Sequence, residues 1–164
     1  MPFTPYHLGP GIAVKAVLQK KFSLLVFAWA QIVMDLQPLA VILTGEGRLH
    51  GITHTFMGAV VLGGAAAVSG KYLSEWVLSW RKQRPRATLS WGTVLLSAGL
   101  GTFSHVLLDA LIYSDMAPFW PFLPENPLRF GVSSWEMTQF CVVSGVLGAL
   151  VWGVVVLVRK RKEN

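Results

Sequence analysis

The residues of this chain best suited to chemistry are histidines and aspartates in or beside long apolar segments. Asp35, His105 and Asp109 fall inside such segments, where an ionisable side chain is costly unless it is paired, solvated or bound to a metal. His105 and Asp109 are four residues apart, so a helix places both on one face. Imidazole and carboxylate are ligands for zinc, and also for iron or manganese. The spacing therefore predicts a metal site within the apolar part of the protein.

The other three histidines precede apolar segments and extend this candidate site. His50 and His54 belong to the sequence HGITHT. They share a face if the following helix begins early, and Gly51 permits a turn that brings them together if it begins late. A single histidine on an apolar face is commonly a hydrogen-bonded core residue, but all four histidines with two intramembrane aspartates favour a metal centre. The candidate metal ligands are His7, Asp35, His50, His54, His105 and Asp109.

Long apolar segments must position these residues. The chain is 53% hydrophobic and only 13% charged, which is too apolar for an ordinary soluble fold. A spanning helix needs about 20 apolar residues. The sequence predicts spans at about 22–44, 55–78, 89–113 and 135–158, and a short half-spanning or re-entrant helix at 8–20. We therefore expect an all-α, polytopic membrane helix bundle that forms one integral membrane domain over residues 1–164.

Basic residues predict the orientation of this bundle. All of the 14 lysines and arginines except Arg48 and Arg129 fall on one side of the predicted spans. By the positive-inside rule that side is cytoplasmic. We expect a multi-pass protein of the plasma (inner) membrane, with a cytoplasmic C-terminus and the metal ligands in the outer half. The charge lies between spans and not on a folded soluble surface, so no nucleic acid partner is expected.

Three further patterns predict local structure. Ser133 followed by Glu136 is typical of a capping box that starts a helix. The small residues Gly145, Ala149 and Gly153 recur at four-residue intervals, which favours close helix contact. The prolines and aromatic residues after Tyr113 suit a cap at the membrane interface, or an inert hydrophobic lid.

The chain resembles the membrane-bound metal-dependent hydrolase family, the YdjM-like inner-membrane hydrolases. The residues that carry the resemblance are the segments TPYHLGPG, MDLQP, HGITHT, and SHVLLD followed by FWPF. That family is in turn similar to the zinc-dependent phospholipase C and single-strand nuclease group, whose ligands follow the order His, Asp, His, then His-x-x-x-Asp. The resemblance implies that His7, Asp35, His54 or His50, His105 and Asp109 bind metal.

The resemblance also limits the number of ions. The soluble enzymes add a histidine and a His-x-x-x-Glu pair near their C-terminus, whereas no histidine follows His105 in this chain. We therefore expect one or two divalent ions, most simply zinc, and not a trinuclear cluster.

The working hypothesis is hydrolysis of an ester or phosphoester by a metal-activated water. Asp35 or Asp109 would orient this water or accept its proton. Arg48 is the candidate for binding an anionic substrate group, with a solvated loop arginine as the alternative. A site at bilayer level implies a lipid or lipid-linked substrate.

Three alternatives remain open at the level of the sequence. They are a metal or ion transporter, a bis-histidine haem protein and a non-catalytic metal-binding membrane protein. Transport is less favoured because the inner halves of the spans hold almost no ionisable residues, and Gln19 and Gln31 are poor substitutes. The sequence does not determine the substrate or the oligomeric state.

Overall fold

The chain folds into α-helices joined by short turns and one long loop. The computed structural model describes residues 4–80 and 88–163. The helices are α1 (Thr4–Leu18), α2 (Leu24–Thr44), α3 (Phe56–Trp80), α4 (Trp91–Ala110) and α5 (Ser134–Glu163), with 3-10 turns at Gln19–Lys21 and Ile52–His54. Helices α2 to α5 are each long and apolar enough to cross a membrane. The predicted all-α class is confirmed, with no strand in the described part of the chain.

The helix boundaries follow from capping groups. The hydroxyl of Ser23 accepts from the backbone N–H of Val26 at the start of α2, and Ser90 starts α4 in the same way. The predicted capping box is confirmed, because the Glu136 carboxylate accepts from both the N–H and the hydroxyl of Ser133, at 2.9 and 2.7 Å. Each contact satisfies a polar group that the first helical turn leaves without a partner.

Predicted boundaries differ from the structure by three to five residues at three places, and one of them is the end of α5, which lies at Glu163 and not at residue 158. Helix α1 begins at Thr4 and not at residue 8, because a proline in the first turn, here Pro5, needs no N–H partner. Helix α4 ends at Ala110 and not at residue 113. The side-chain amide of Asn126 donates to the carbonyls of Ala110 and Tyr113, at 2.8 Å each, so the long loop satisfies carbonyls that a longer helix would have used.

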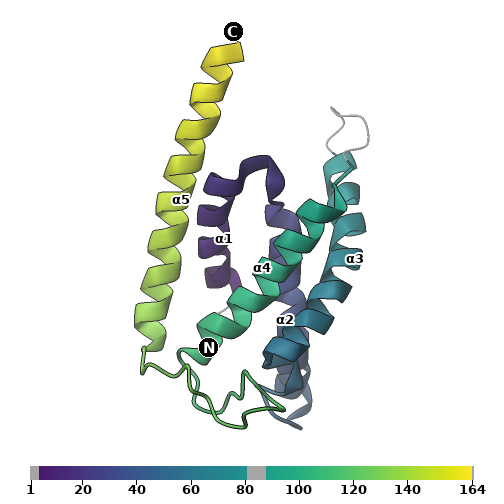
Figure 1. Cartoon of the computed structure of the whole chain (residues 1–164), viewed down its shortest axis with the longest axis vertical. Helices are drawn as coiled ribbons and strands as arrows, with labels where there is room; N and C mark the ends of the chain where they lie inside the picture. Colours follow the sequence, from purple (N-terminus) through teal and green to yellow (C-terminus); the bar gives the residue numbers. More distant parts are fainter. Residues whose placement is uncertain (1–3, 81–87, 164) are drawn as a thin grey trace.

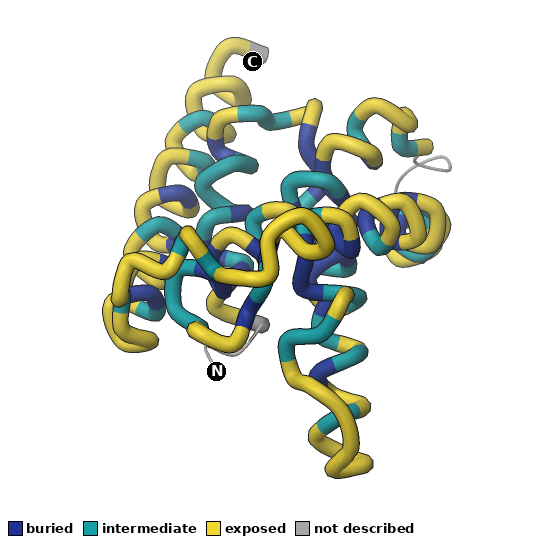
Figure 2. Tube along the Cα trace, turned by 60° about the horizontal axis from the view of Figure 1, so that its bottom comes forward, coloured by how far each residue is buried: buried dark blue, intermediate teal, exposed yellow. Residues whose placement is uncertain are grey.

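Helices α2, α3 and α4 pack against one another and form the centre of the bundle. Helix α1 lies between α2 and α5, and α5 packs chiefly on α1 (Figure 1). Buried residues lie where the helices face each other, whereas much of α5 is exposed (Figure 2). The long loop from α4 to α5 runs across the lower end of the bundle in Figure 1. It is packed there, since Met116 is buried among side chains of α2, α3 and α4.

The small-residue pattern of α5 is only partly right. Gly145 packs on Gly9 of α1, and Gly148 packs on Ala13. Gly153 has open space around it and Ala149 is exposed. A helix has 3.6 residues per turn, so residues at a strict four-residue interval move gradually around its surface. The two glycines that face α1, Gly145 and Gly148, are instead three residues apart.

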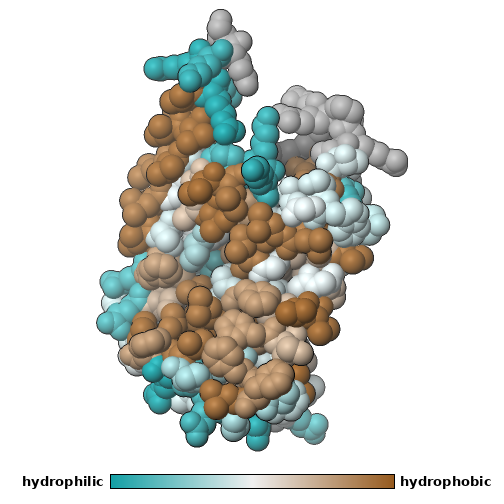
Figure 3. Space-filling view, viewed as in Figure 1, coloured by the Kyte–Doolittle hydropathy of each residue, from teal (hydrophilic) through white to brown (hydrophobic). Residues whose placement is uncertain are grey.

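The outer surface suits a bilayer. Hydrophobic side chains cover the middle of the face shown in Figure 3, and hydrophilic side chains gather at its lower edge and at the end of α5. Trp76, Trp80, Trp91, Trp120 and Trp135 are all exposed, as expected of residues at a membrane interface. Part of the basic cluster, Arg81, Lys82, Arg84 and Arg86, lies outside the described residues.

Candidate metal centre

The centre of the site is His105, which α4 holds against two carboxylates. Its ring nitrogen Nε2 lies 3.3 Å from Asp35 Oδ1 of α2 and 3.3 Å from Asp109 Oδ2, one turn further along α4. His105 is fully buried. Its Nε2 forms no hydrogen bond with either carboxylate within the described part of the chain, so the two oxygens flank this nitrogen and do not lie on its N–H axis.

Asp109 joins His105 to the histidines of two other segments. Its Oδ1 lies 3.7 Å from Nε2 of His7 in α1. Its Oδ2 lies 3.9 Å from Nε2 of His54 in the turn before α3. The rings of His7 and His54 have their centroids 4.8 and 5.3 Å from that of His105. Five predicted ligands, His105 and Asp109 included, therefore come together from four separate segments.

The proton on His105 is fixed by Gln31. The side-chain oxygen of Gln31, one turn before Asp35 on α2, lies 2.6 Å from His105 Nδ1, and its amide nitrogen donates to Ser104. A carbonyl oxygen can only accept, so Nδ1 of His105 carries the hydrogen. In neutral His105 the lone pair of Nε2 then points between the oxygens of Asp35 and Asp109, and such an arrangement is stable when a cation lies among the three groups.

The distances fit a metal ion. Tetrahedral ligands at 2.0–2.2 Å from zinc lie roughly 3.3 Å from one another, and Nε2 of His105 lies at this distance from one oxygen of Asp35 and one of Asp109. Asp35, His54 and His105 each offer a ligand atom within 4.8 Å of the others, and form a possible metal-binding triad. His7 Nε2 is a second buried nitrogen without a hydrogen-bond partner among the described residues. The donor set and these nitrogens therefore suit a divalent cation.

His54 is positioned by a turn and not by the helix that follows it. Helix α3 begins at Phe56, so of the two geometries open to HGITHT the structure has the late start. The Thr53 hydroxyl lies 3.1 Å from His54 Nδ1 and donates to Gln37 of α2. Burial, and then the nearby His105, lower the pKa of His54 to about 4. The imidazole is neutral at ordinary pH, which is the form that binds a metal.

His50 lies at the edge of the cluster and has its own carboxylate partner. Its ring centroid is 5.5 Å from that of His54, but its Nδ1 lies 2.9 Å from Asp115 in the long loop. Its ring also stacks on Tyr113, with 4.4 Å between centroids. The structure thus brings His50 beside the other histidines without including it in the possible metal-binding triad.

The remaining predicted residue, Arg48, is exposed. Its backbone carbonyl accepts from the side chain of Gln37. This contact connects the loop to α2 but places no cationic group at the cluster. The open edge of the site is instead Asp35, whose side chain is 31% exposed, compared with 7% for Asp109.

Sequence reasoning missed the residues that orient the ligands. Gln31 was considered only as a weak transport residue, although its position four residues before Asp35 would have placed it on the same helix face. For Asp115 and Gln37 the sequence contains no comparable spacing to a candidate ligand. Asp115 contacts His50, and Gln37 contacts Thr53 beside His54, only because a loop folds back onto the bundle, and sequence spacing does not encode such a contact.

The orienting role of Gln31 leads to a prediction. Gln31→Leu keeps the side-chain size but removes the acceptor for His105 Nδ1, so we expect the affinity for zinc to fall by about 10- to 100-fold, as for other partners of metal ligands. Ser104→Ala removes the weaker 3.4 Å contact to the Gln31 amide and a bond to the Gly101 carbonyl within α4, but no contact of His105, and should change the affinity by less than about 3-fold. Competition with a zinc-sensitive dye measures both. Equal affinities in the two variants would contradict the role given to Gln31.

Comparison with known proteins gives one family. No curated protein and no solved structure matches the chain. The family model described as YdjM inner membrane protein matches residues 10–163. The match covers every residue of the cluster except His7, which precedes it. The chain therefore belongs to the YdjM inner membrane protein family.

Proposed function

We propose that this protein is a membrane-embedded, metal-dependent hydrolase that cleaves an ester or phosphoester bond of a lipid or lipid-linked substrate. The observation that carries the proposal is the contact of the buried His105 Nε2 with Asp35 and Asp109, at 3.3 Å from each. A carboxylate pair beside an unpartnered imidazole nitrogen is costly inside a membrane protein unless the site holds a cation.

The residues that would hold the metal are Asp35, His54 and His105, with Asp109 and His7 completing the shell. When bound, a divalent metal such as zinc supplies the Lewis acidity that activates water at neutral pH. The absence of thiolates in this shell favours a catalytic site over a structural zinc site. The triad would hold one ion, and Asp109 and His7 would contribute to holding a second.

The two aspartates have different surroundings and so different roles. Asp109 is almost fully buried, and its two oxygens face different histidines, so we assign it to holding the site together. Asp35 is partly exposed at the edge of the cluster. It is therefore the better group to orient the attacking water and to accept its proton.

The lipid character of the substrate is supported by the surface around Asp35. Ile32, Leu36 and Leu39 on the same helix are 46%, 52% and 50% exposed. A substrate with an apolar tail can approach Asp35 along these side chains without leaving the membrane. Arg48 remains the candidate for binding an anionic headgroup, at the end of α2 nearest the cluster.

The experiment measures metal content and hydrolysis on the same purified protein. We expect stoichiometric zinc, and hydrolysis of at least one member of a panel of phospholipids, lipid phosphates and carboxyl esters. Removal of metal by a chelator should abolish this hydrolysis, and zinc should restore it.

Two results would contradict the proposal. Protein without a stoichiometric divalent metal would exclude the metal centre. Metal-loaded protein that cleaves nothing on the panel, but moves zinc across proteoliposomes, would favour the transporter. Asp35→Asn should reduce hydrolysis far more than its matched control Glu46→Gln, which makes the same change of charge on an exposed loop.

A further inference from the structure

A second site lies at the opposite end of α1 from the metal centre. An open groove of about 520 Å³ runs between the turn after α1 and the end of α5. It is lined by Val17, Leu18, Gln19, Lys20, Lys21 and Arg159. His7 and Leu18 are eleven residues apart on one helix, so about 16 Å of helix separates the two sites.

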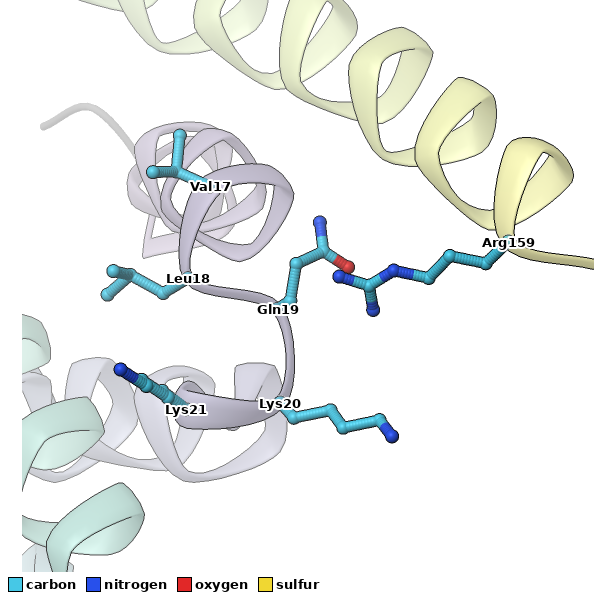
Figure 4. A pocket seen from close by; sticks show the side chains of 6 residues that line it. All are labelled: Val17, Leu18, Gln19, Lys20, Lys21 and Arg159. Carbon is cyan, nitrogen blue, oxygen red and sulfur yellow. The ribbon is translucent and has the colours of Figure 1, made fainter. Parts of the chain in front are cut away.

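Basic groups from distant parts of the sequence meet in this groove. Arg159 reaches from α5 toward Gln19, and Lys20 extends on the same side of the turn, whereas Lys21 points the other way (Figure 4). Among the described residues, Lys71 and Glu75 form the salt bridge between a basic side chain and a carboxylate. Neither Lys20 nor Arg159 takes part in it. Lys20 and Arg159 are therefore available to an anion from outside the protein.

The turn that presents these groups is held in one conformation. Gln19 has a positive φ of 50°, a left-handed conformation that a residue with a side chain rarely adopts. The ammonium of Lys15 donates to the carbonyls of Gln19 and Phe22, at 2.7 and 2.6 Å, and so closes the turn from inside. Backbone strain that neighbouring contacts maintain is found at binding sites more often than elsewhere.

The groove also borders on apolar surface. Val17 is 78% exposed on one side of it, and on α5 Leu157 and Val158 are 64% and 48% exposed just before Arg159. An anion that binds between Lys20 and Arg159 would thus lie where the hydrophobic faces of α1 and α5 end. This suits a ligand whose charged group continues into acyl chains.

We infer that this groove binds the phosphate of an anionic phospholipid, in the leaflet at the basic end of the bundle. Lys20 and Arg159 contact the phosphate, and the acyl chains lie along the exposed side chains of α1 and α5. Basic pockets between membrane helices recognise lipid headgroups in this way. The site differs from the proposed hydrolytic centre in position and chemistry, and does not depend on it.

The test is a lipid titration of the full chain in detergent, followed by native mass spectrometry. The probes are phosphatidylglycerol, zwitterionic phosphatidylcholine and inorganic phosphate. We expect phosphatidylglycerol to bind at least about tenfold more tightly than the other two. In the double variant Lys20→Gln/Arg159→Gln this affinity should fall by roughly 30-fold, from the loss of two cations.

The matched control is Arg161→Gln/Lys162→Gln. It removes the same two residue types from the exposed end of α5, outside the groove, and should change the affinity by less than about 3-fold. The unfolding midpoint of each variant in detergent verifies that it is folded. An equal loss in both variants, or no preference for phosphatidylglycerol over phosphatidylcholine, would overturn the inference. Equally tight binding of inorganic phosphate would assign the groove to free phosphate instead.

Discussion

Replacing His105 by alanine is expected to lower the affinity for a divalent metal by more than about 100-fold, and to abolish hydrolysis. His105 lies 3.3 Å from both Asp35 and Asp109. Its loss removes a proposed ligand and leaves the two carboxylates without the nitrogen that lies 3.3 Å from each. Losing a partner of a ligand already costs 10- to 100-fold in metal affinity, and losing the ligand itself should cost more. Elemental analysis of the purified variant measures the effect.

The control for His105→Ala must separate loss of a ligand from loss of packing. Val106→Ala is suitable, because Val106 is the next residue on α4 and is also fully buried. It leaves a small cavity that costs stability, on the order of 1 kcal/mol or more, but removes no ligand atom. We expect Val106→Ala to retain its metal. A His105→Ala protein with wild-type metal content would show that the metal binds elsewhere and that His105 is an ordinary core residue.

Of the substitutions considered, Gly9→Ala should lower the free energy of unfolding the most. A Cβ atom at position 9 would lie 1.8 Å from the carbonyl oxygen of Cys141, and 2.7 Å from its carbon. Both atoms belong to the backbone of α5 and cannot rotate away, so α1 and α5 must separate. Overpacking of this kind typically costs about 1–3 kcal/mol, and we expect the upper end of that range or more. The midpoint of unfolding in a denaturing detergent measures it.

Gly64→Ala is the matched control for Gly9→Ala. It makes the same substitution inside α3, where an added Cβ meets nothing within 4 Å. Alanine in a helix interior is favoured over glycine by roughly 0.5–1 kcal/mol, so this variant should be as stable as the wild type or more stable. Because α1 carries His7, only Gly9→Ala should also weaken metal binding. Equal stability of the two variants would mean that α1 does not pack on α5 as described.

The positions of the helices could be predicted from the sequence because each depends on local composition. Four apolar segments of about 20 residues predicted the four helices α2 to α5 within a few residues. The capping box at Ser133 and Glu136 was equally local. The end of α4 was missed because its deciding contact is distant in sequence, since Asn126 of the long loop contacts the carbonyls there.

In the candidate site, too, the local features could be predicted from the sequence. The sequence by itself determined which residues are expensive in a membrane, and so selected Asp35, His105 and Asp109 with the other three histidines. It also placed His105 and Asp109 on one face of a helix, because a separation of four residues fixes that relation. These conclusions need only composition and the period of the helix.

Only the tertiary structure decided which contacts each of these residues makes, and so which role it can have. It brought His7 and His54 to the two oxygens of Asp109, paired His50 with Asp115, and placed the Gln31 carbonyl on His105. It also formed the basic groove, from Lys20 and a residue of the C-terminal helix. Each of these contacts joins segments far apart in the chain. Their geometry depends on how the helices pack and rotate against one another, which residue spacing within a single helix does not specify.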